Sequence, residues 1–314
     1  MIPKNTAKWP MSRIGIVSKR GWILFIALGI IWGTPYLFIR VAVVDLSPAI
    51  VVFARVMIAA LILLPIAIHQ GHARSLRTHW RGILAFAGIE MCIPFGALGI
   101  AEKEISSSLT GLLIAMVPLI NAVISRQLGL DSVWDKRRII GLFVGFFGVG
   151  MLVGFDISAS NYWAIALCLI AATGYALGPI IITKLLSDVA SIGVIAWSLL
   201  VAGLIYAPVV AYEVLTDSWR APGVTDVSQN AILSVVALGV LCSAIAFVAL
   251  FELIKEVGPT RTTVITYINP AVAIILGILV LSEPITTGII IGFPLVLIGS
   301  VMATRRNVEV VEER

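Results

Sequence analysis

The stretch GWILFIALGIIWGTPYLFIRVAV, residues 21–43, decides the class of this protein. It has about the 20 residues that an apolar helix needs to cross the hydrocarbon core of a bilayer. Its middle nevertheless carries Gly33, Thr34 and Pro35, and Arg40 follows near its end. Because Pro35 removes a backbone donor and clashes with the preceding turn, it predicts a kink. A membrane tolerates such a break where protein or a water-filled cavity satisfies the freed backbone groups. The segment is therefore either a packing kink or part of a cavity wall.

The composition of the whole chain agrees with a membrane protein. Hydrophobic residues make up 60% of the sequence and charged residues only 12%, whereas a soluble domain carries roughly 25% charge. The mean hydropathy is +1.06, and no segment is long enough for a soluble domain. The ten expected spans are residues 21–43, 48–68, 82–101, 106–127, 138–155, 161–184, 191–212, 230–253, 260–281 and 285–304. No small-residue cleavage site follows the first span, so we expect it to be retained.

Lysine and arginine are divided unequally between the two ends of these spans. With a cytoplasmic N-terminus, 18 of the 22 basic residues lie in cytoplasmic segments, and only Arg40, Lys103 and Arg220 lie outside. Cytoplasmic loops of membrane proteins carry such an excess. The sequence therefore predicts that both termini are cytoplasmic and that the 213–230 connection is external. The same asymmetry explains the pI of 9.3 without nucleic acid as a partner.

The two halves of the chain carry landmarks in the same order. A shift of 152 residues places Pro118 on Pro270, and a shift of 143 residues places Pro65 on Pro208. Because each half has five spans, the second half must enter the membrane from the opposite face. This is the inverted repeat of secondary transporters, whose substrate site lies near the midplane. We expect an all-α fold of ten transmembrane helices, with repeats at 21–155 and 161–304 between an N-terminal segment, 1–20, and a tail, 305–314.

Two stretches carry a resemblance to a known family. The first is IIWGTPYLFIR (30–40) with the following SPAIVVFARVMIAALILLP, which contains Arg55. The second is GPTRTTVITYINPAVAIILGILVLSEPITTGIIIGFPLVLIGSVM (258–302), which contains Tyr267, Pro270 and Glu283. The chain resembles the EamA branch of the drug/metabolite transporter superfamily, although LGLDSV with Asp131 replaces the Gly-Glu pair that usually closes the fourth span. The resemblance implies a bacterial inner-membrane exporter of small metabolites, amino acids foremost, with aromatic or hydrophobic ones among them.

Residues near midspan are the candidates for substrate contact and for gating. The resemblance assigns the first, fourth, sixth and ninth spans to the central cavity, and intramembrane charges are costly enough to be paired or functional. The candidates for substrate binding are Trp32, Glu90, Asn121, Tyr175, Tyr267 and Asn269. The candidates for kinks and gating are Gly33, Pro35, Pro118 and Pro270. Glu90 is either a protonated, hydrogen-bonded carboxyl or a site for a substrate amine or a proton. We expect Arg55 to be structural and Arg40 to extend to the membrane interface.

Other classes of function have less support. The chain has no Walker loop, and three arginines accompany His69, His72 and His79, which predicts a solvated basic loop rather than a metal site. The three cysteines, Cys92, Cys168 and Cys242, all fall within spans, so we expect free thiols. We expect no cofactor and no catalytic residues; a lipid-modifying membrane enzyme is the alternative. Facilitated diffusion is favoured over proton coupling, because Glu90 is the only acidic side chain at midspan.

Overall fold

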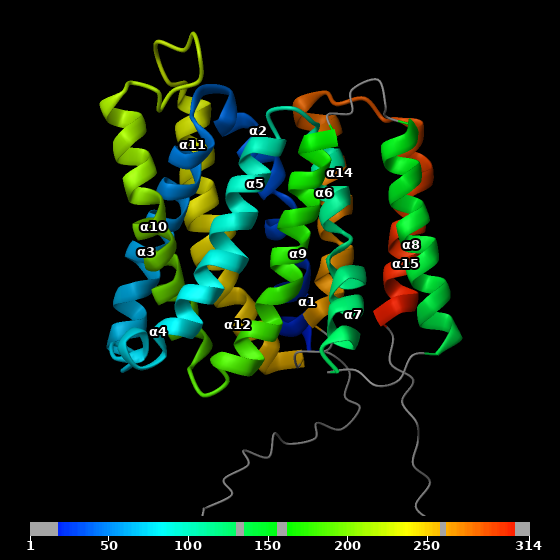
Figure 1. The fold of residues 1–314 in the computed structure, drawn as a ribbon, viewed down its shortest axis with the longest axis horizontal. Helices are drawn as coiled ribbons and strands as arrows, with labels where there is room; N and C mark the ends of the chain where they lie inside the picture. The colour runs from blue at the N-terminus through cyan, green and yellow to red at the C-terminus, as the bar shows by residue number, and fades with distance from the viewer. Residues whose placement is uncertain (1–17, 130–134, 156–161, 258–261, 305–314) are drawn as a thin grey trace, which may run out of the picture.

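The structure is a computed structural model, and it describes residues 18–129, 135–155, 162–257 and 262–304. Asp131, residues 1–17 of the expected N-terminal segment 1–20, and the expected tail 305–314 lie outside the described residues. The described chain is helical, and its helices stand side by side along one common direction (Figure 1). We call the end at which α1 begins and α15 ends the termini face, and the opposite end the distal face.

The elements of the first half make five spans. They are α1 (Lys19–Gly33), α2 (Pro35–Asp45), α3 (Pro48–His69), α4 (Ser75–Phe86), η1 (Ala87–Cys92), α5 (Ile93–Ala101), α6 (Ser107–Ile114), α7 (Val117–Gln127) and α8 (Lys136–Phe155). The elements of the second half make the other five. They are α9 (Tyr162–Leu185), α10 (Ser191–Leu215), α11 (Gln229–Gly239), η3 (Val240–Ile245), α12 (Ala246–Val257), η4 (Thr263–Tyr267), α14 (Asn269–Leu281) and α15 (Thr287–Thr304).

Nine of these spans are long and apolar enough to cross a membrane, and Ile265–Leu281 is a shorter apolar helix. The first half starts upward from the termini face and the second half starts downward from the distal face (Figure 1). This confirms the predicted fold of ten membrane helices in two inverted five-helix repeats. The third span begins at Ser75 rather than at residue 82, because two amphipathic turns with Arg77 and Arg81 precede its apolar part.

Several spans are interrupted, and most interruptions recur in both halves. The first span breaks at Thr34, between α1 and α2. The fourth span breaks between α6 and α7, just before Pro118, and the ninth breaks between η4 and α14, just before Pro270. The third and eighth spans each contain a π-helical turn, η1 and η3. The proline-linked breaks follow from the lost backbone donor and the clash with the preceding turn.

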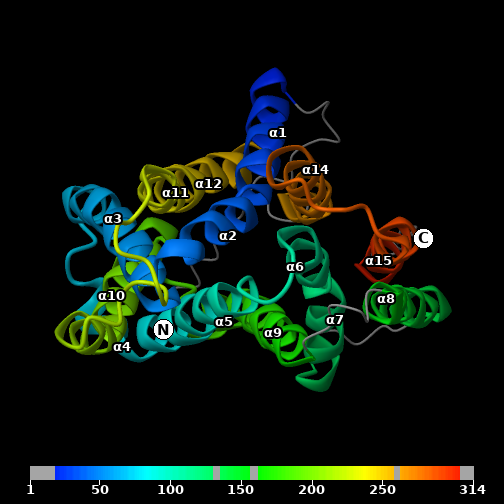
Figure 2. The ribbon, with the colours of Figure 1, turned by 90° about the horizontal axis from the view of Figure 1, so that it is seen from above.

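At each end of the bundle, a helix of the first half packs on a helix of the second half. α3 packs on α10 at one end of the molecule and α8 packs on α15 at the other end (Figure 2). A Cβ at Gly141 would lie 2.8 Å from the carbonyl oxygen of Gly299, and a Cβ at Gly299 would lie 2.5 Å from the Cα of Gly145. The α8–α15 contact is therefore a close backbone approach that small residues permit.

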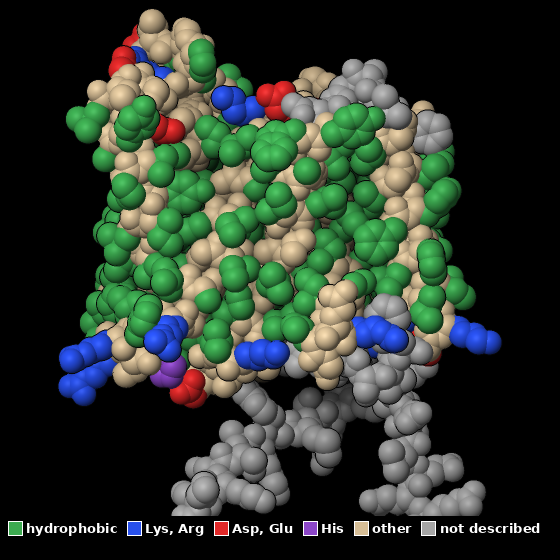
Figure 3. All heavy atoms as spheres, in the orientation of Figure 1, with side chains coloured by type: hydrophobic (Ala, Val, Ile, Leu, Met, Phe, Trp, Pro, Cys, Tyr) green, Lys and Arg blue, Asp and Glu red, His purple; other side chains and the backbone are tan. Residues whose placement is uncertain are grey.

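The surface divides into three zones. Side chains of lysine and arginine gather along the termini face, and charged side chains reappear at the distal face (Figure 3). Between them lies a hydrophobic band (Figure 3). Phe143 and Phe147, in the middle of α8, and Leu204, in the middle of α10, are all more than half exposed. Water would make this band costly, so it is the lipid-facing surface.

Candidate functional site

The π-helical turns η1 and η3 occupy equivalent places in the third and eighth spans. A π-turn leaves the regular α-helical ladder, and such turns are frequent at functional sites. The hydroxyl of Tyr206 on α10 donates to the carbonyl oxygen of Cys92 in η1, at 2.9 Å. In the other half, Nε of Arg55 on α3 donates to the hydroxyl of Ser243 in η3 at 3.0 Å, and that hydroxyl donates to the carbonyl of Leu238 at 2.8 Å. Each irregular turn is therefore held by a side chain from the neighbouring peripheral helix.

Glu90 projects from η1 toward α9. The residue is half-buried, but its Oε2 atom is fully buried, and no hydrogen bond from the described residues reaches it. A Cβ at Gly178 of α9 would overlap this oxygen, and a Cβ at Gly174 would overlap the carbonyl oxygen of Ile89. The two glycines therefore let η1 and its carboxyl approach the backbone of α9.

Arg55 is buried, at 7% exposure, and it takes part in an aromatic stack. Its guanidinium lies 3.9 Å from the centre of the Phe95 ring. The Phe95 ring in turn lies 6.4 Å from the ring of Tyr175, tilted by 57°. A cation over an aromatic face is stabilised by the ring quadrupole, more so when desolvated. Together with its bond to Ser243, this stack gives Arg55 a structural role between the two halves.

At the break in the first span, a side chain bonds to a backbone carbonyl of the preceding turn. Oγ1 of Thr34 donates to the carbonyl oxygen of Ile31 at 2.8 Å and lies 3.2 Å from the sulfur of Cys242. At Gly33 a Cβ would overlap the side chain of Val272 and lie 2.9 Å from the carbonyl of Asn269. The Gly33–Pro35 segment is therefore a close contact between the first and ninth spans.

The two asparagines occupy related breaks and bond to different helices. Nδ2 of Asn121 donates to the carbonyl oxygen of Ala176 on α9 at 2.8 Å. The amide of Asn269, in the orientation that satisfies its surroundings, donates to Ile265 at 3.1 Å and to Gly29 on α1 at 3.0 Å. Each amide therefore ties a broken helix to the helix that opens the opposite half.

The structure gathers the six predicted substrate-binding residues into two groups and leaves one apart. Glu90, Asn121 and Tyr175 meet around α9. Trp32 lies on α1, where its ring meets Phe247 edge-on at 6.1 Å, and Asn269 bonds to the same helix. The hydroxyl of Tyr267 instead contacts α15 near the termini face, at 3.3 Å from the carbonyl of Ser300 and 2.6 Å from Oγ1 of Thr304.

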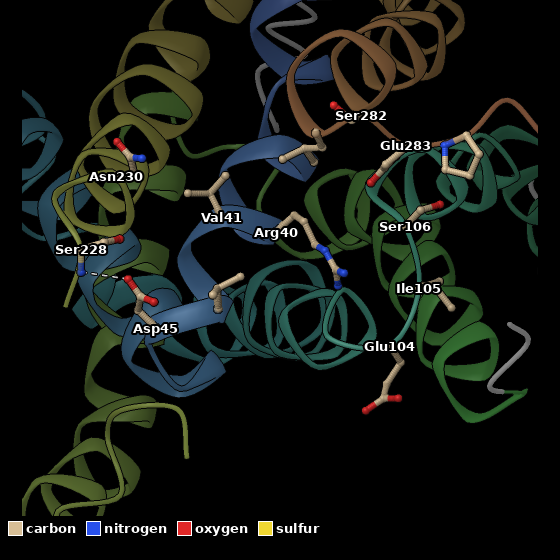
Figure 4. A pocket seen from close by; sticks show the side chains of 13 residues that line it. Arg40, Val41, Asp45, Glu104, Ile105, Ser106, Ser228, Asn230, Ser282 and Glu283 are labelled. Atoms are coloured by element: carbon tan, nitrogen blue, oxygen red, sulfur yellow. Dashed lines mark hydrogen bonds between the residues drawn. The ribbon is translucent and has the colours of Figure 1, made fainter. Parts of the chain in front are cut away.

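A pocket opens at the distal face, between the first, fourth, eighth and ninth spans (Figure 4). Its volume is about 530 Å³. Arg40 lines this pocket and donates a hydrogen bond to the backbone carbonyl of Glu102. That it extends to the membrane interface stays a prediction. The lining residues are Arg40, Val41, Val44, Asp45, Glu104, Ile105, Ser106, Ser228, Asn230, Leu281, Ser282, Glu283 and Pro284.

Glu283 joins the two halves beside this pocket. Its carboxylate accepts hydrogen bonds from the backbone N–H groups of Ser107 and Ser108, at 2.7 and 3.0 Å, and from the Ser108 hydroxyl at 2.5 Å. These amides belong to the first turn of α6, where a negative charge also interacts well with the helix dipole. A residue of the second half therefore caps a helix of the first half at the distal face. We call this contact the distal latch.

Glu102 is a buried acid that the sequence analysis did not single out. It follows α5 at the distal face and has 0% exposure. No hydrogen bond of normal geometry reaches either carboxyl oxygen from the described residues, and the hydroxyl of Ser107 is also buried without a partner. Burial raises the pKa of the Glu102 carboxyl well above its usual value, although the charge of nearby Arg40 lowers it. Its neighbours Lys103 and Glu104 are exposed, so the sequence EKE gives no signal that its first residue is buried.

Comparison with known proteins assigns the chain to one class. The model of the EamA-like transporter family matches twice, over residues 19–154 and 162–305. The chain is 29% identical over 254 residues to the uncharacterized inner membrane transporter YedA of Escherichia coli K12, covering 80% of this chain and 79% of that one. It is 24% identical to the uncharacterized transporter YvbV of Bacillus subtilis, covering 89% and 90%. A solved crystal structure shares the fold with a TM-score of 0.63 at 20% identity, covering 92% of this chain and 98% of the other.

Proposed function

The chain belongs to the EamA-like transporter family and is a membrane transporter; on this premise we propose that it exports small metabolites, amino acids foremost, by alternating access. The transport path runs between the two inverted halves, near the middle of the membrane. The proposed setting is the inner membrane of a bacterium, with both termini in the cytoplasm. The basic residues along the termini face support this orientation, because cytoplasmic ends carry the positive excess.

One observation carries the mechanism: the interruptions of the helices recur at equivalent places in both halves. The π-turns lie in the third and eighth spans, and the breaks before Pro118 and Pro270 lie in the fourth and ninth. Discontinuous helices at the repeat interface form the substrate sites of inverted-repeat transporters. The backbone groups that such breaks free must bond to protein or to water in a cavity, because lipid offers no hydrogen-bond partner.

The side chains around α9 support an amino-acid substrate. Oε2 of Glu90 has no hydrogen-bond donor among the described residues, and a substrate ammonium group would supply one once the carboxyl has moved away from Gly178. The rings of Tyr175 and Phe95, 6.4 Å apart, offer an apolar surface, and Glu90 acts electrostatically on Tyr175. Binding sites for small molecules combine such apolar walls with a few polar groups that fix orientation. A site of this kind favours an amino acid with an aromatic or hydrophobic side chain.

The test is counterflow exchange in reconstituted vesicles with a panel of radiolabelled amino acids. We expect exchange of aromatic or large aliphatic amino acids, and reduced exchange when Trp32, Glu90, Asn121, Tyr175 or Asn269 is replaced by alanine. Tyr212→Ala is the matched control, because this tyrosine is 67% exposed on α10. Unchanged kinetics in all five variants would exclude the proposed cavity, and exchange of none of the amino acids would exclude the substrate class.

Glu90→Gln tests whether the midspan acid carries a transported proton. Glutamine keeps the shape of the carboxyl and one acceptor oxygen but cannot release a proton. We expect a modest loss of transport and intact exchange, because facilitated diffusion down a metabolite gradient needs no proton carrier. Accumulation driven by an imposed pH gradient, lost in Glu90→Gln while exchange survives, would establish proton antiport instead.

A further inference from the structure

We propose that Glu102 is a proton-binding site of a distal gate, by which we mean the distal latch between Glu283 and the first turn of α6. The site is occupied when this gate is closed and emptied to the distal compartment when it opens. This inference rests on the alternating-access function proposed above. It concerns the opening of the gate and not the driving force. A proton that enters and leaves from the same side does no transport work, so the site is compatible with facilitated diffusion.

The location of Glu102 argues for a site between the pocket and the protein interior. Arg40 and Glu283 line the distal pocket, and both act electrostatically on the Glu102 carboxyl. Arg40 also bonds to the backbone of Glu102. Two residues that line the pocket therefore lie close to a fully buried carboxyl, and one of them, Glu283, belongs to the distal latch.

The buried carboxyl of Glu102 requires a bound proton or cation. An ionised carboxylate without hydrogen bonds in an apolar interior is very unfavourable, and such groups instead take up a proton. Both oxygens of Glu102 lack a partner among the described residues. The ionisable groups that act on it from the packed elements are Tyr36 and Arg40 of α2, Arg55 of α3, Cys168 and Tyr175 of α9, and Glu283 before α15.

A proton fits this site better than a metal cation. Hard cations such as Ca²⁺ take about six or more oxygen ligands, whereas only the Glu102 oxygens and the Ser107 hydroxyl are buried and free near this turn, among the residues that the structure describes. The hydroxyls of Ser108 and Thr110 already donate to Glu283 and to Ser106. The positive charge of Arg40 would also repel a metal ion.

Opening the gate would favour the ionised form of Glu102 over the protonated form. When Glu283 leaves the first turn of α6, water reaches the connection between α5 and α6. The acid then loses its proton to water, and the resulting carboxylate is solvated beside the guanidinium of Arg40. The closed gate thus binds one more proton than the open gate. Opening therefore becomes easier as the distal pH rises, by up to about tenfold in its equilibrium constant per pH unit.

The test measures gate opening without any substrate. Ser107→Cys is introduced into a chain whose three native cysteines are replaced, since the Ser107 side chain is buried in the closed gate. The rate of labelling by a membrane-impermeant thiol reagent from the distal side is measured from about pH 5 to about pH 8, in the range where a raised carboxyl pKa acts. The same measurement is made with Glu102→Gln, which mimics the protonated acid, and with Glu104→Gln, an exposed acid two residues away.

The labelling rate of the parent is divided by that of the Glu102→Gln variant. Because both proteins carry the same cysteine, the pH dependence of the thiol's own reactivity cancels in this ratio. We expect this ratio to be near unity at low pH and to rise with pH, by up to about tenfold per unit, while Glu104→Gln follows the parent. A ratio that does not change with pH overturns the proposal. So does a ratio that depends on the sodium concentration at constant pH, which would identify a metal cation as the occupant.

A second measurement covers the case in which Glu102→Gln does not fold. In the Glu90→Gln protein, the infrared carbonyl band of a protonated carboxyl should persist at neutral pH, because Glu102 retains its proton. The absence of this band overturns the proposal. Neither measurement uses an amino acid, so a failed transport assay leaves this inference standing, and a pH-independent gate leaves the transport function standing.

Discussion

The carboxyl of Glu90 rests against the backbone of Gly178, and there is no room for a Cβ between them. This contact joins the π-turn of the third span to the sixth span. Gly178→Ala should therefore force the carboxyl or the helix to move and lower the free energy of unfolding by about 1–3 kcal/mol. The midpoint of thermal unfolding in detergent measures the effect.

Two variants control this prediction. Gly150→Ala adds the same methyl group where no atom lies within 4 Å, and it should be neutral or stabilising by up to about 1 kcal/mol because alanine favours a helix. Glu90→Ala combined with Gly178→Ala should restore most of the loss. If Gly178→Ala is as stable as Gly150→Ala, the two helices do not approach as closely as described.

The distal latch should hold the gate closed. Glu283→Gln leaves one acceptor oxygen for three donors, so the closed state should lose about 1–3 kcal/mol. Labelling of Ser107→Cys from the distal side should then accelerate by roughly fivefold or more, since about 1.4 kcal/mol corresponds to a factor of ten. Asp226→Asn, a change of the same kind on the exposed 213–230 connection, should leave the rate unchanged. Equal rates in both variants would show that Glu283 does not restrain the gate.

Arg55 should be important for stability rather than for substrate contact. Arg55→Lys loses the Nε bond to Ser243 and the contact of the guanidinium with the Phe95 ring, which should cost about 2 kcal/mol or more in a buried site. Arg81→Lys is the matched control, because this exposed arginine also lies over a ring, that of Trp80 at 5.3 Å. Its loss should stay below about 1 kcal/mol. The free energy of unfolding of both variants, measured by denaturation, tests this prediction. Similar small losses in both would show that the contact of Arg55 with Phe95 does not stabilise the fold.

The orientation in the membrane is open to a direct test. A reporter that is active only outside the cytoplasm should be inactive after Arg314 and active when inserted at Gly223. Gly223 lies in a distal turn with a φ of +86°, and no atom lies within 4 Å of the position of a Cβ there. The expectation follows from the basic residues along the termini face. Activity after Arg314 would reverse the assignment of the two sides.

The sequence was sufficient for the number and order of the spans, because hydropathy and proline positions are local signals. Pro35, Pro118 and Pro270 each lie within two residues of an actual break. The π-turns η1 and η3 carried no such signal, since they depend on how neighbouring helices pack. The same holds for Arg40 and Glu102. Both stand at the ends of spans, where charged residues normally reach water, and only the fold shows that Arg40 lines a pocket and bonds to the backbone of a buried Glu102.

The packing of first-half helices on second-half helices has a consequence for biosynthesis. α3 packs on α10 and α8 packs on α15, so the first five helices enter the bilayer before the helices that cover them exist. Ribosomes add roughly 5–20 residues per second, and the second half therefore follows on the order of ten seconds later. During that interval Arg55 lies in the membrane without Ser243. The nascent first half is thus the stage at which this protein most needs protection, by the insertion machinery or by a membrane chaperone.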